Sequence, residues 1–150
     1  MDKSQLLLLL TCALALYGTG QVWLVQISSY ALWPFVGRQE FRAYHLAWWR
    51  SIWIVVLVPA ALVLAGSVLM LWWRPPGAQP WAVWTGFGLQ MALLLGTALW
   101  WGPLMARIEA PEGGLSPERY RLLMTTHWLR AGIVTAYAIL SLWMLARSAG

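Results

Sequence analysis

Residues 51–73 read SIWIVVLVPAALVLAGSVLMLWW, a run that contains no charged side chain. A helix needs about 20 predominantly apolar residues to cross a hydrocarbon core of about 30 Å, so this stretch is long enough to span a bilayer. Pro59 lies inside the run and lacks the amide hydrogen that an α-helix requires at that position. We therefore predict a transmembrane helix over 51–73 that is kinked near Pro59.

Three further apolar stretches flank this one, at 6–26, 81–101 and 128–146, and none of them contains an acidic residue. Residues 74–80, RPPGAQP, cannot continue a helix and predict a short turn between two antiparallel neighbours. Inside lipid every backbone polar group must be paired within the protein, which favours helices for all four stretches. The sequence thus predicts an all-α fold, an integral membrane four-helix bundle with short loops, as a single domain over 1–150.

The overall composition agrees with a membrane location. The chain is 61% hydrophobic and 10% charged, against about 45–50% and about 25% in soluble domains. The ten basic residues are scattered among apolar runs, so acidic lipid head groups are a better partner for them than nucleic acid. Cys12 is the only cysteine, which excludes an intrachain disulfide and a thiolate metal cluster.

The basic residues also predict an orientation. Four spans place both termini and the 74–80 turn on one side of the membrane, with loops 27–50 and 102–127 on the other. The first side carries Lys3, Arg74 and Arg147, and the second carries Arg38, Arg42, Arg50, Arg107, Arg119, Arg121 and Arg130. The positive-inside rule therefore predicts that loops 27–50 and 102–127 are cytoplasmic and that both termini lie outside.

Both histidines are expected on the side with more basic residues, each on an apolar helical stripe. Residues at the spacing i, i+3, i+4 share one helical face, so both histidines are predicted to face the bundle interior. The first stripe contains Phe41, Tyr44, His45, Trp48 and Ile52, and the second contains Tyr120, Leu123, Met124, His127, Arg130, Val134 and Tyr137.

Two cofactor hypotheses follow from this pair of histidines. His45 and His127 are candidate ligands of one metal ion, completed by a carboxylate from Glu40, Glu109 or Glu112. Alternatively, the two histidines are candidate axial ligands of one b-type haem held between the second and fourth helices. Neither hypothesis rests on a recognised spacing motif.

A third hypothesis needs no cofactor. Arginines that border a span are costly and often functional, so an anionic or quinone-like head group could bind where the helices separate. The candidate residues for this site are Gln26, Tyr44, Arg50, Trp128 and Arg130. The structural alternative is that the histidines are hydrogen-bonded to neighbours and the arginines reach out to lipid phosphates.

Two glutamines lie in apolar surroundings and need hydrogen-bond partners. Gln26, near the end of the first span, is predicted to face the same cavity as His45. Gln90, near the middle of the third span, is predicted to bond to Tyr17, Ser67 or another helix.

Several short motifs resemble a known family. They are Val25-Gln26, Tyr30-Ala31-Leu32-Trp33, Phe41, Tyr44-His45 and Val58-Pro59. Together they resemble small bacterial four-helix membrane proteins similar to the anthrone-oxygenase-like domain family. That family often has a histidine soon after a proline at the end of the third span, where this chain reads Pro103-Leu104-Met105. Its Asn-Trp-x-Arg motif on the fourth helix is replaced here by His127-Trp128-Leu129-Arg130.

This resemblance implies a bacterial inner membrane and directs attention to the face that holds His45, Trp128 and Arg130. Two function classes follow. The chain contains no nucleotide-binding loop, nucleophile triad or thiol pair, which favours an accessory or structural subunit that associates with other membrane proteins or with itself. The alternative, implied by the resemblance, is a membrane oxidoreductase that acts on an aromatic or quinone-like substrate near His45, His127 and Arg130.

Overall fold

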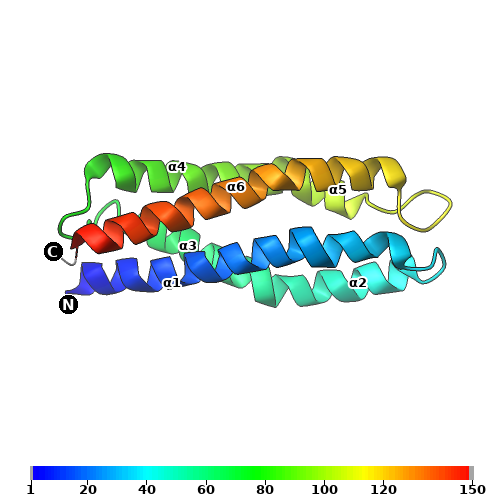
Figure 1. The fold of residues 1–150 in the computed structure, drawn as a ribbon, viewed down its shortest axis with the longest axis horizontal. Coiled ribbons are helices and arrows are strands. Elements are labelled where there is room, and N and C mark those ends of the chain that lie inside the picture. The colour runs from blue at the N-terminus through cyan, green and yellow to red at the C-terminus, as the bar shows by residue number, and fades with distance from the viewer. Residues whose placement is uncertain (1, 149–150) are drawn as a thin grey trace.

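Four helical segments run the length of the molecule in antiparallel order (Figure 1). The computed structural model describes residues 2–148, and within that range it contains helices and turns with one isolated bridge, Glu109–Leu115. Both chain ends and the α3–α4 turn lie at one end of the bundle, which we call the terminal end. The two other connections, 36–40 before α2 and 107–116 before α6, lie at the opposite end, which we call the loop end.

Three of the four segments change helix type along their length. The first consists of α1 (Lys3–Leu24), the π-helical turn η1 (Val25–Ser29) and the 3-10 helix η2 (Tyr30–Phe35). The second consists of α2 (Phe41–Ile52), the π-helical turn η3 (Trp53–Leu57) and α3 (Val58–Leu69). The third consists of α4 (Pro80–Gly96), the π-helical turn η4 (Thr97–Trp101) and α5 (Gly102–Ala106), and the fourth is α6 (Pro117–Ser148) alone.

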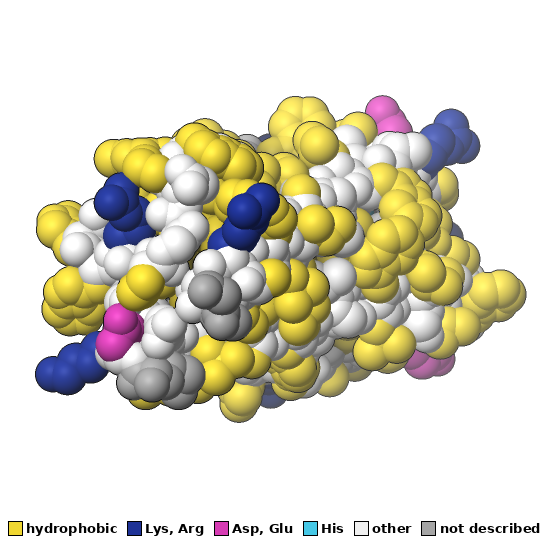
Figure 2. All heavy atoms as spheres, turned by 60° about the vertical axis from the view of Figure 1, so that its left-hand side comes forward, with side chains coloured by type: hydrophobic (Ala, Val, Ile, Leu, Met, Phe, Trp, Pro, Cys, Tyr) yellow, Lys and Arg dark blue, Asp and Glu magenta, His cyan; other side chains and the backbone are white. Residues whose placement is uncertain are grey.

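All four segments are long and apolar enough to cross a membrane. Many large hydrophobic side chains point outward, among them Leu24, Ile54, Leu99 and Ile139. Figure 2 shows hydrophobic side chains covering much of the visible flank. In water this surface would be costly, whereas lipid solvates it. The chain is therefore a multi-pass membrane protein, as the hydropathy predicts.

The helices extend well beyond the predicted spans, and this corrects the predicted loops. Most of 27–50 and 102–127 is helical, which leaves 36–40 and 107–116 as the connections at the loop end. At the terminal end α3 stops at Leu69, before the predicted boundary at 73. The predicted loops carry basic residues that lower the average hydropathy. In α2, however, Arg42 and Arg50 are exposed while Phe41 and His45 are buried, which is the pattern of an amphipathic helix.

The terminal half of the bundle is packed through small residues. A side chain at Gly66 of α3 would overlap Thr11 of α1, so the two backbones are close. Next to this contact, the Ser67 hydroxyl lies 2.6 Å from the Tyr137 hydroxyl of α6. Small interfacial residues and hydroxyl pairs stabilise helix contacts in lipid, where burial gives little driving force.

Two of the π-helical turns end two residues before a proline. η3 ends at Leu57 before Pro59, and η4 ends at Trp101 before Pro103. Proline donates no hydrogen bond, so it leaves an earlier carbonyl without its helical partner. The carbonyl four residues before Pro59 belongs to Val55, and it accepts a hydrogen bond of 3.3 Å from the Tyr17 hydroxyl. The predicted interruption near Pro59 is thus confirmed as a π-helical turn whose freed carbonyl is bonded by α1.

Candidate ligand site

The loop half of the bundle encloses a cavity at the level of the three π-helical turns. Its volume is about 140 Å³, and it is partly open to the outside. Val25 of η1, Val56 of η3 and Thr97 of η4 each contribute to the wall. A π-helical turn inserts an extra residue into a helix and is often found at functional sites. The wall is mainly apolar, with a few polar side chains.

Arg130 of α6 carries the positive charge of this cavity. It lines the wall, half-buried, and its guanidinium carbon lies 5.7 Å from the centre of the Trp101 ring. In residues 2–148 the single carboxylate contact of a basic side chain joins His45 to Glu109, so no carboxylate pairs with Arg130. The cation–π contact supplies part of the missing stabilisation. The five donors of the guanidinium remain available to a ligand.

His127 lies one helical turn before Arg130 and also lines the cavity. Its Nδ1 is 2.8 Å from Oε1 of Gln26 in η1. Gln26 is itself fixed, because its Nε2 donates to the Met124 carbonyl over 3.2 Å. Both side chains are almost fully buried, with exposed fractions of 2% for His127 and 1% for Gln26. Gln26 was predicted to face the same cavity as His45, but neither side chain lines this cavity, and Gln26 is instead buried against His127.

Gln90 of α4 is the second polar group in the wall. Its side chain is 5% exposed and lines the cavity, and it bonds to none of the described side chains or carbonyls. The predicted partners are otherwise engaged, since Ser67 bonds to Tyr137 and Tyr17 bonds to Val55. An unpaired buried amide is costly in an apolar environment. Gln90 is therefore a group that a bound molecule would satisfy.

The cavity has one polar end and one apolar end. Tyr30, His127 and Arg130 lie toward the loop end, where Trp48 and Trp101 also contribute. Toward the terminal end the wall consists of small and aliphatic side chains, among them Leu14, Ala15, Ala60 and Val63. Gln90 and Tyr137 are the polar side chains in that part. This arrangement matches a molecule with a polar head and an apolar body.

His45 lies outside this cavity, in a separate aromatic cluster. Its ring stacks on Phe41 at 5.8 Å and contacts Trp33 at 5.5 Å, and its Nδ1 lies 3.4 Å from Oε1 of Glu109. Tyr30 contacts Trp33 at 4.8 Å on one side and His127 at 5.0 Å on the other. The two histidines are thus joined by a chain of packed rings, which fills the space that a shared ligand would need.

This packing does not fit either cofactor hypothesis. Residues 2–148 contain no group of three or more His, Cys, Asp or Glu side chains placed to hold a metal ion. A haem between the histidines would have to displace Tyr30 and Trp33, which are 2% and 0% exposed. His45 and His127 are each oriented by their own hydrogen bond instead, which agrees with the structural alternative for His45.

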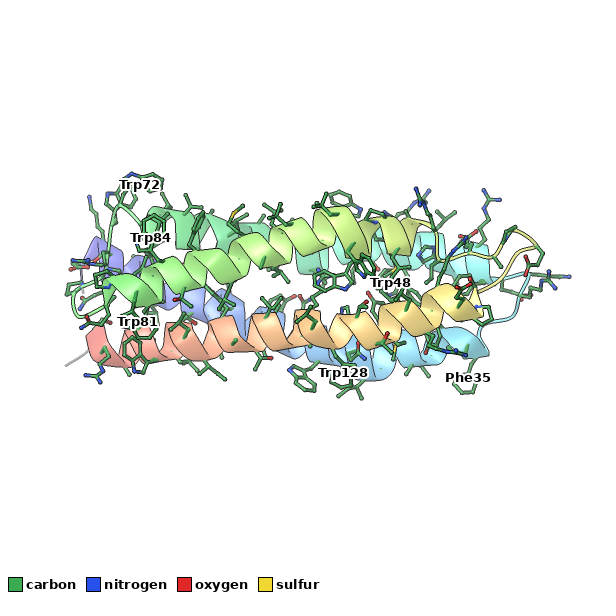
Figure 3. The ribbon with its side chains drawn as sticks, turned by 90° about the horizontal axis from the view of Figure 1, so that it is seen from above. Phe35, Trp48, Trp72, Trp81, Trp84 and Trp128 are labelled. Carbon is green, nitrogen blue, oxygen red and sulfur yellow. The ribbon has the colours of Figure 1, made fainter. Side chains whose placement is uncertain are left out.

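Three predicted site residues face away from the cavity. Tyr44 is 38% exposed although it lies beside the buried His45, and Arg50 of α2 is also exposed. Trp128 points outward from α6, whereas Trp48 points between the helices (Figure 3). Trp128 packs on Trp23 of α1, with ring centres 5.5 Å apart. Successive helical residues point about 100° apart, so the neighbours of buried residues on α2 and α6 reach the outside.

Tyr30, Trp101 and Gln90 also line the cavity, and the sequence pattern did not predict them there. The prolines that follow two of the π-helical turns are the one signal that could have located this level of the bundle. Comparison with known proteins finds no matching family model, no matching curated protein and no matching solved structure. The resemblance to the anthrone-oxygenase-like family therefore stays a prediction.

Proposed function

We propose that this protein binds an amphiphilic small molecule from the membrane and holds its anionic or quinone-like head group at Arg130. The observation that carries the proposal is a guanidinium that lines an apolar cavity and pairs with no carboxylate among the described residues. A charge in such a place is expensive unless something compensates it. A carboxylate or a polarised carbonyl oxygen would do so, and a carboxylate could bind in the two-bond geometry that arginine favours.

The depth of the cavity supports a ligand taken from lipid. Tryptophans gather near both ends of the spans, with Trp72, Trp73, Trp81 and Trp84 around the 74–80 turn and Trp48, Trp49, Trp53, Trp100, Trp101 and Trp128 toward the loop end. Trp81 and Trp101 are 20 positions apart, which corresponds to about 30 Å of helix. Tryptophan favours the head-group zone, so these clusters indicate the two membrane interfaces. Arg130, beside Trp101, would then lie at head-group depth, and Gln90 near the middle of the hydrocarbon. The polar and apolar ends of the cavity would match the bilayer around it.

The aromatic wall favours a ring as one form of head group. Trp48, Trp49 and Trp101 all line the cavity, and a flat conjugated ring could pack on their faces. Oxidation or reduction of such a ring would need a redox partner, so an oxidoreductase activity stays a prediction. The accessory-subunit role, the cytoplasmic location of the loop end and the bacterial inner membrane also stay predictions.

The test uses the purified protein in phosphatidylcholine nanodiscs. Binding of tritiated dodecanoate and of a decyl-substituted benzoquinone is measured at equilibrium, after subtraction of protein-free nanodiscs. Arg130→Met removes the charge and keeps an unbranched apolar side chain. Arg50→Met is the matched control, because Arg50 is an exposed arginine at the same end of the bundle.

We expect saturable binding of at least one probe. A hydrogen bond to a charged group contributes about 1.5–3 kcal/mol, so Arg130→Met should weaken binding about 10- to 100-fold. Arg50→Met should bind as the wild type does. Absence of saturable binding for both probes, or equal affinity in Arg130→Met and wild type, would overturn the proposal.

A further inference from the structure

The hydrogen bonds around His127 determine which of its ring nitrogens carries the proton. The Met124 carbonyl can only accept, so the Gln26 atom that faces it is the amide nitrogen. The other amide atom of Gln26 is therefore the oxygen, and it accepts from Nδ1–H of His127. In the neutral imidazole this leaves Nε2 without a proton, as a hydrogen-bond acceptor.

The His127 acceptor and the Arg130 donors form a two-part site. The two residues are three positions apart on α6, and both line the cavity. Side chains at this spacing lie on the same face of a helix, with Cβ atoms about 5–6 Å apart. Tyr30 packs edge-on against the imidazole at 5.0 Å, which holds the ring in place from η2. No described residue bonds to Nε2, so it is available to a bound molecule.

From this pair we infer that the cavity selects an anionic amphiphile that carries a hydroxyl group close to its anionic oxygen, with Arg130 binding the anion and Nε2 of His127 accepting from the hydroxyl. A long-chain 3-hydroxy carboxylate is the simplest molecule of this class. The apolar part of the cavity would take its chain. The inference rests on the proposed function and adds the specificity of its head-group site. His127 acts here as a specificity-determining residue.

The geometry explains why an ordinary carboxylate would leave the site incomplete. A carboxylate offers acceptors alone, so it would satisfy Arg130 but leave Nε2 of His127 unpaired. A site built to bond a hydroxyl discriminates against the analogue that lacks it, because a buried polar group then loses its partner. A quinone has the same shortcoming, since its two oxygens are also acceptors.

The test measures how unlabelled acids displace tritiated dodecanoate from the protein in phosphatidylcholine nanodiscs. The competitors are dodecanoate, 3-hydroxydodecanoate and 12-hydroxydodecanoate. The last has the same polarity as the 3-hydroxy acid but places its hydroxyl at the far end of the chain. A neutral hydrogen bond contributes about 0.5–1.5 kcal/mol, so the 3-hydroxy acid should bind about 2- to 10-fold more tightly than dodecanoate. The 12-hydroxy acid should show no such gain.

Two variants separate the hydroxyl preference from anion binding. Gln26→Leu with His127→Leu removes both members of the buried pair, so neither is left unsatisfied. This double variant should still bind dodecanoate through Arg130 but should lose the preference for the 3-hydroxy acid. Gln26→Leu alone frees the imidazole to place its proton on Nε2, and it should reduce the preference while keeping the ring.

The outcomes are distinguishable. Absence of saturable dodecanoate binding overturns this inference, and the proposed function fails with it only if the decyl-substituted benzoquinone also shows no saturable binding. Saturable binding without a preference in the wild type overturns the inference alone. A preference that persists in the double variant, or one that the 12-hydroxy acid shares, overturns it as well.

Discussion

The two halves of this bundle use the same four helices for different purposes. In the terminal half the helices are regular, glycine and threonine bring α1 and α3 together, and Ser67 bonds to Tyr137 across the interface. In the loop half three segments pass through π-helical turns and surround a cavity lined by Arg130 and Gln90, which have no side-chain hydrogen bond to the described part of the chain. The comparison separates regular helix contacts through small residues from an aromatic core that leaves a cavity, for which we have proposed a ligand.

The largest loss of stability should come from a bulky side chain at the close contact between α1 and α3 in the terminal half. Gly66→Leu would force a branched side chain into the space of Thr11, and α1 and α3 would have to separate. Overpacking of a tight interface costs about 1–3 kcal/mol and more where backbones must move. We expect loss of most folded protein, measured as the monodisperse fraction in detergent and as the thermal unfolding temperature.

Gly88→Leu is the matched control for this change. Gly88 lies on α4, and a side chain there would meet no atom within 4 Å. The variant should therefore fold like the wild type. A second check is Gly66→Ala combined with Thr11→Gly, which should recover much of the stability that Gly66→Ala loses. If Gly66→Leu and Gly88→Leu behave alike, the terminal half is not the tightly packed half.

Substitutions of polar cavity residues should change stability in the opposite direction. Arg130→Met removes a half-buried charge that pairs with no carboxylate in residues 2–148, and Gln90→Leu removes an amide that bonds to none of these residues. Binding sites often sacrifice stability for function. Each change should leave the unfolding temperature in nanodiscs unchanged or raise it, by an amount equivalent to about 1 kcal/mol. A clear loss of stability in both variants would mean that Arg130 and Gln90 have structural partners.

The sequence was sufficient for the four helices because lipid leaves few alternatives to them. Hydropathy alone left 27–50 and 102–127 out of the spans, because charged residues on the outer face of a helix lower an average that takes no account of direction. Helical spacing nevertheless predicted the stripes around His45 and His127 in these segments, and α2 and α6 confirm them. Helical spacing placed His127, Arg130 and Tyr137 correctly on one inward stripe. On α2 the same spacing included Tyr44, which lies at the edge of the buried face and points outward.

Helical spacing and hydropathy do not show which side chains of different helices pair with each other. Gln26 and His127 are 101 positions apart, and their bond depends on which helices are neighbours around the bundle. Hydropathy does not encode that order. For the same reason Gln90 was given partners that it does not have, and the two histidines were brought together although an aromatic cluster separates them.

The smallest expected change in stability concerns the pair of hydroxyl groups in the terminal half. Ser67 and Tyr137 are 2% and 1% exposed, and their oxygen atoms are 2.6 Å apart. Interhelical hydrogen bonds in membrane proteins contribute about 0.6 kcal/mol on average, because the separated helices also find polar partners. A double-mutant cycle with Ser67→Ala and Tyr137→Phe should therefore give a coupling energy of about 0.6 kcal/mol in unfolding experiments. The Tyr17 hydroxyl, which lies 3.3 Å from the Val55 carbonyl at an exposed site, should be worth less when Tyr17→Phe is measured in the same way. A larger loss for Tyr17→Phe than for Tyr137→Phe would reverse the comparison, because the π-helical turn would then contribute more to stability than the regular interface does.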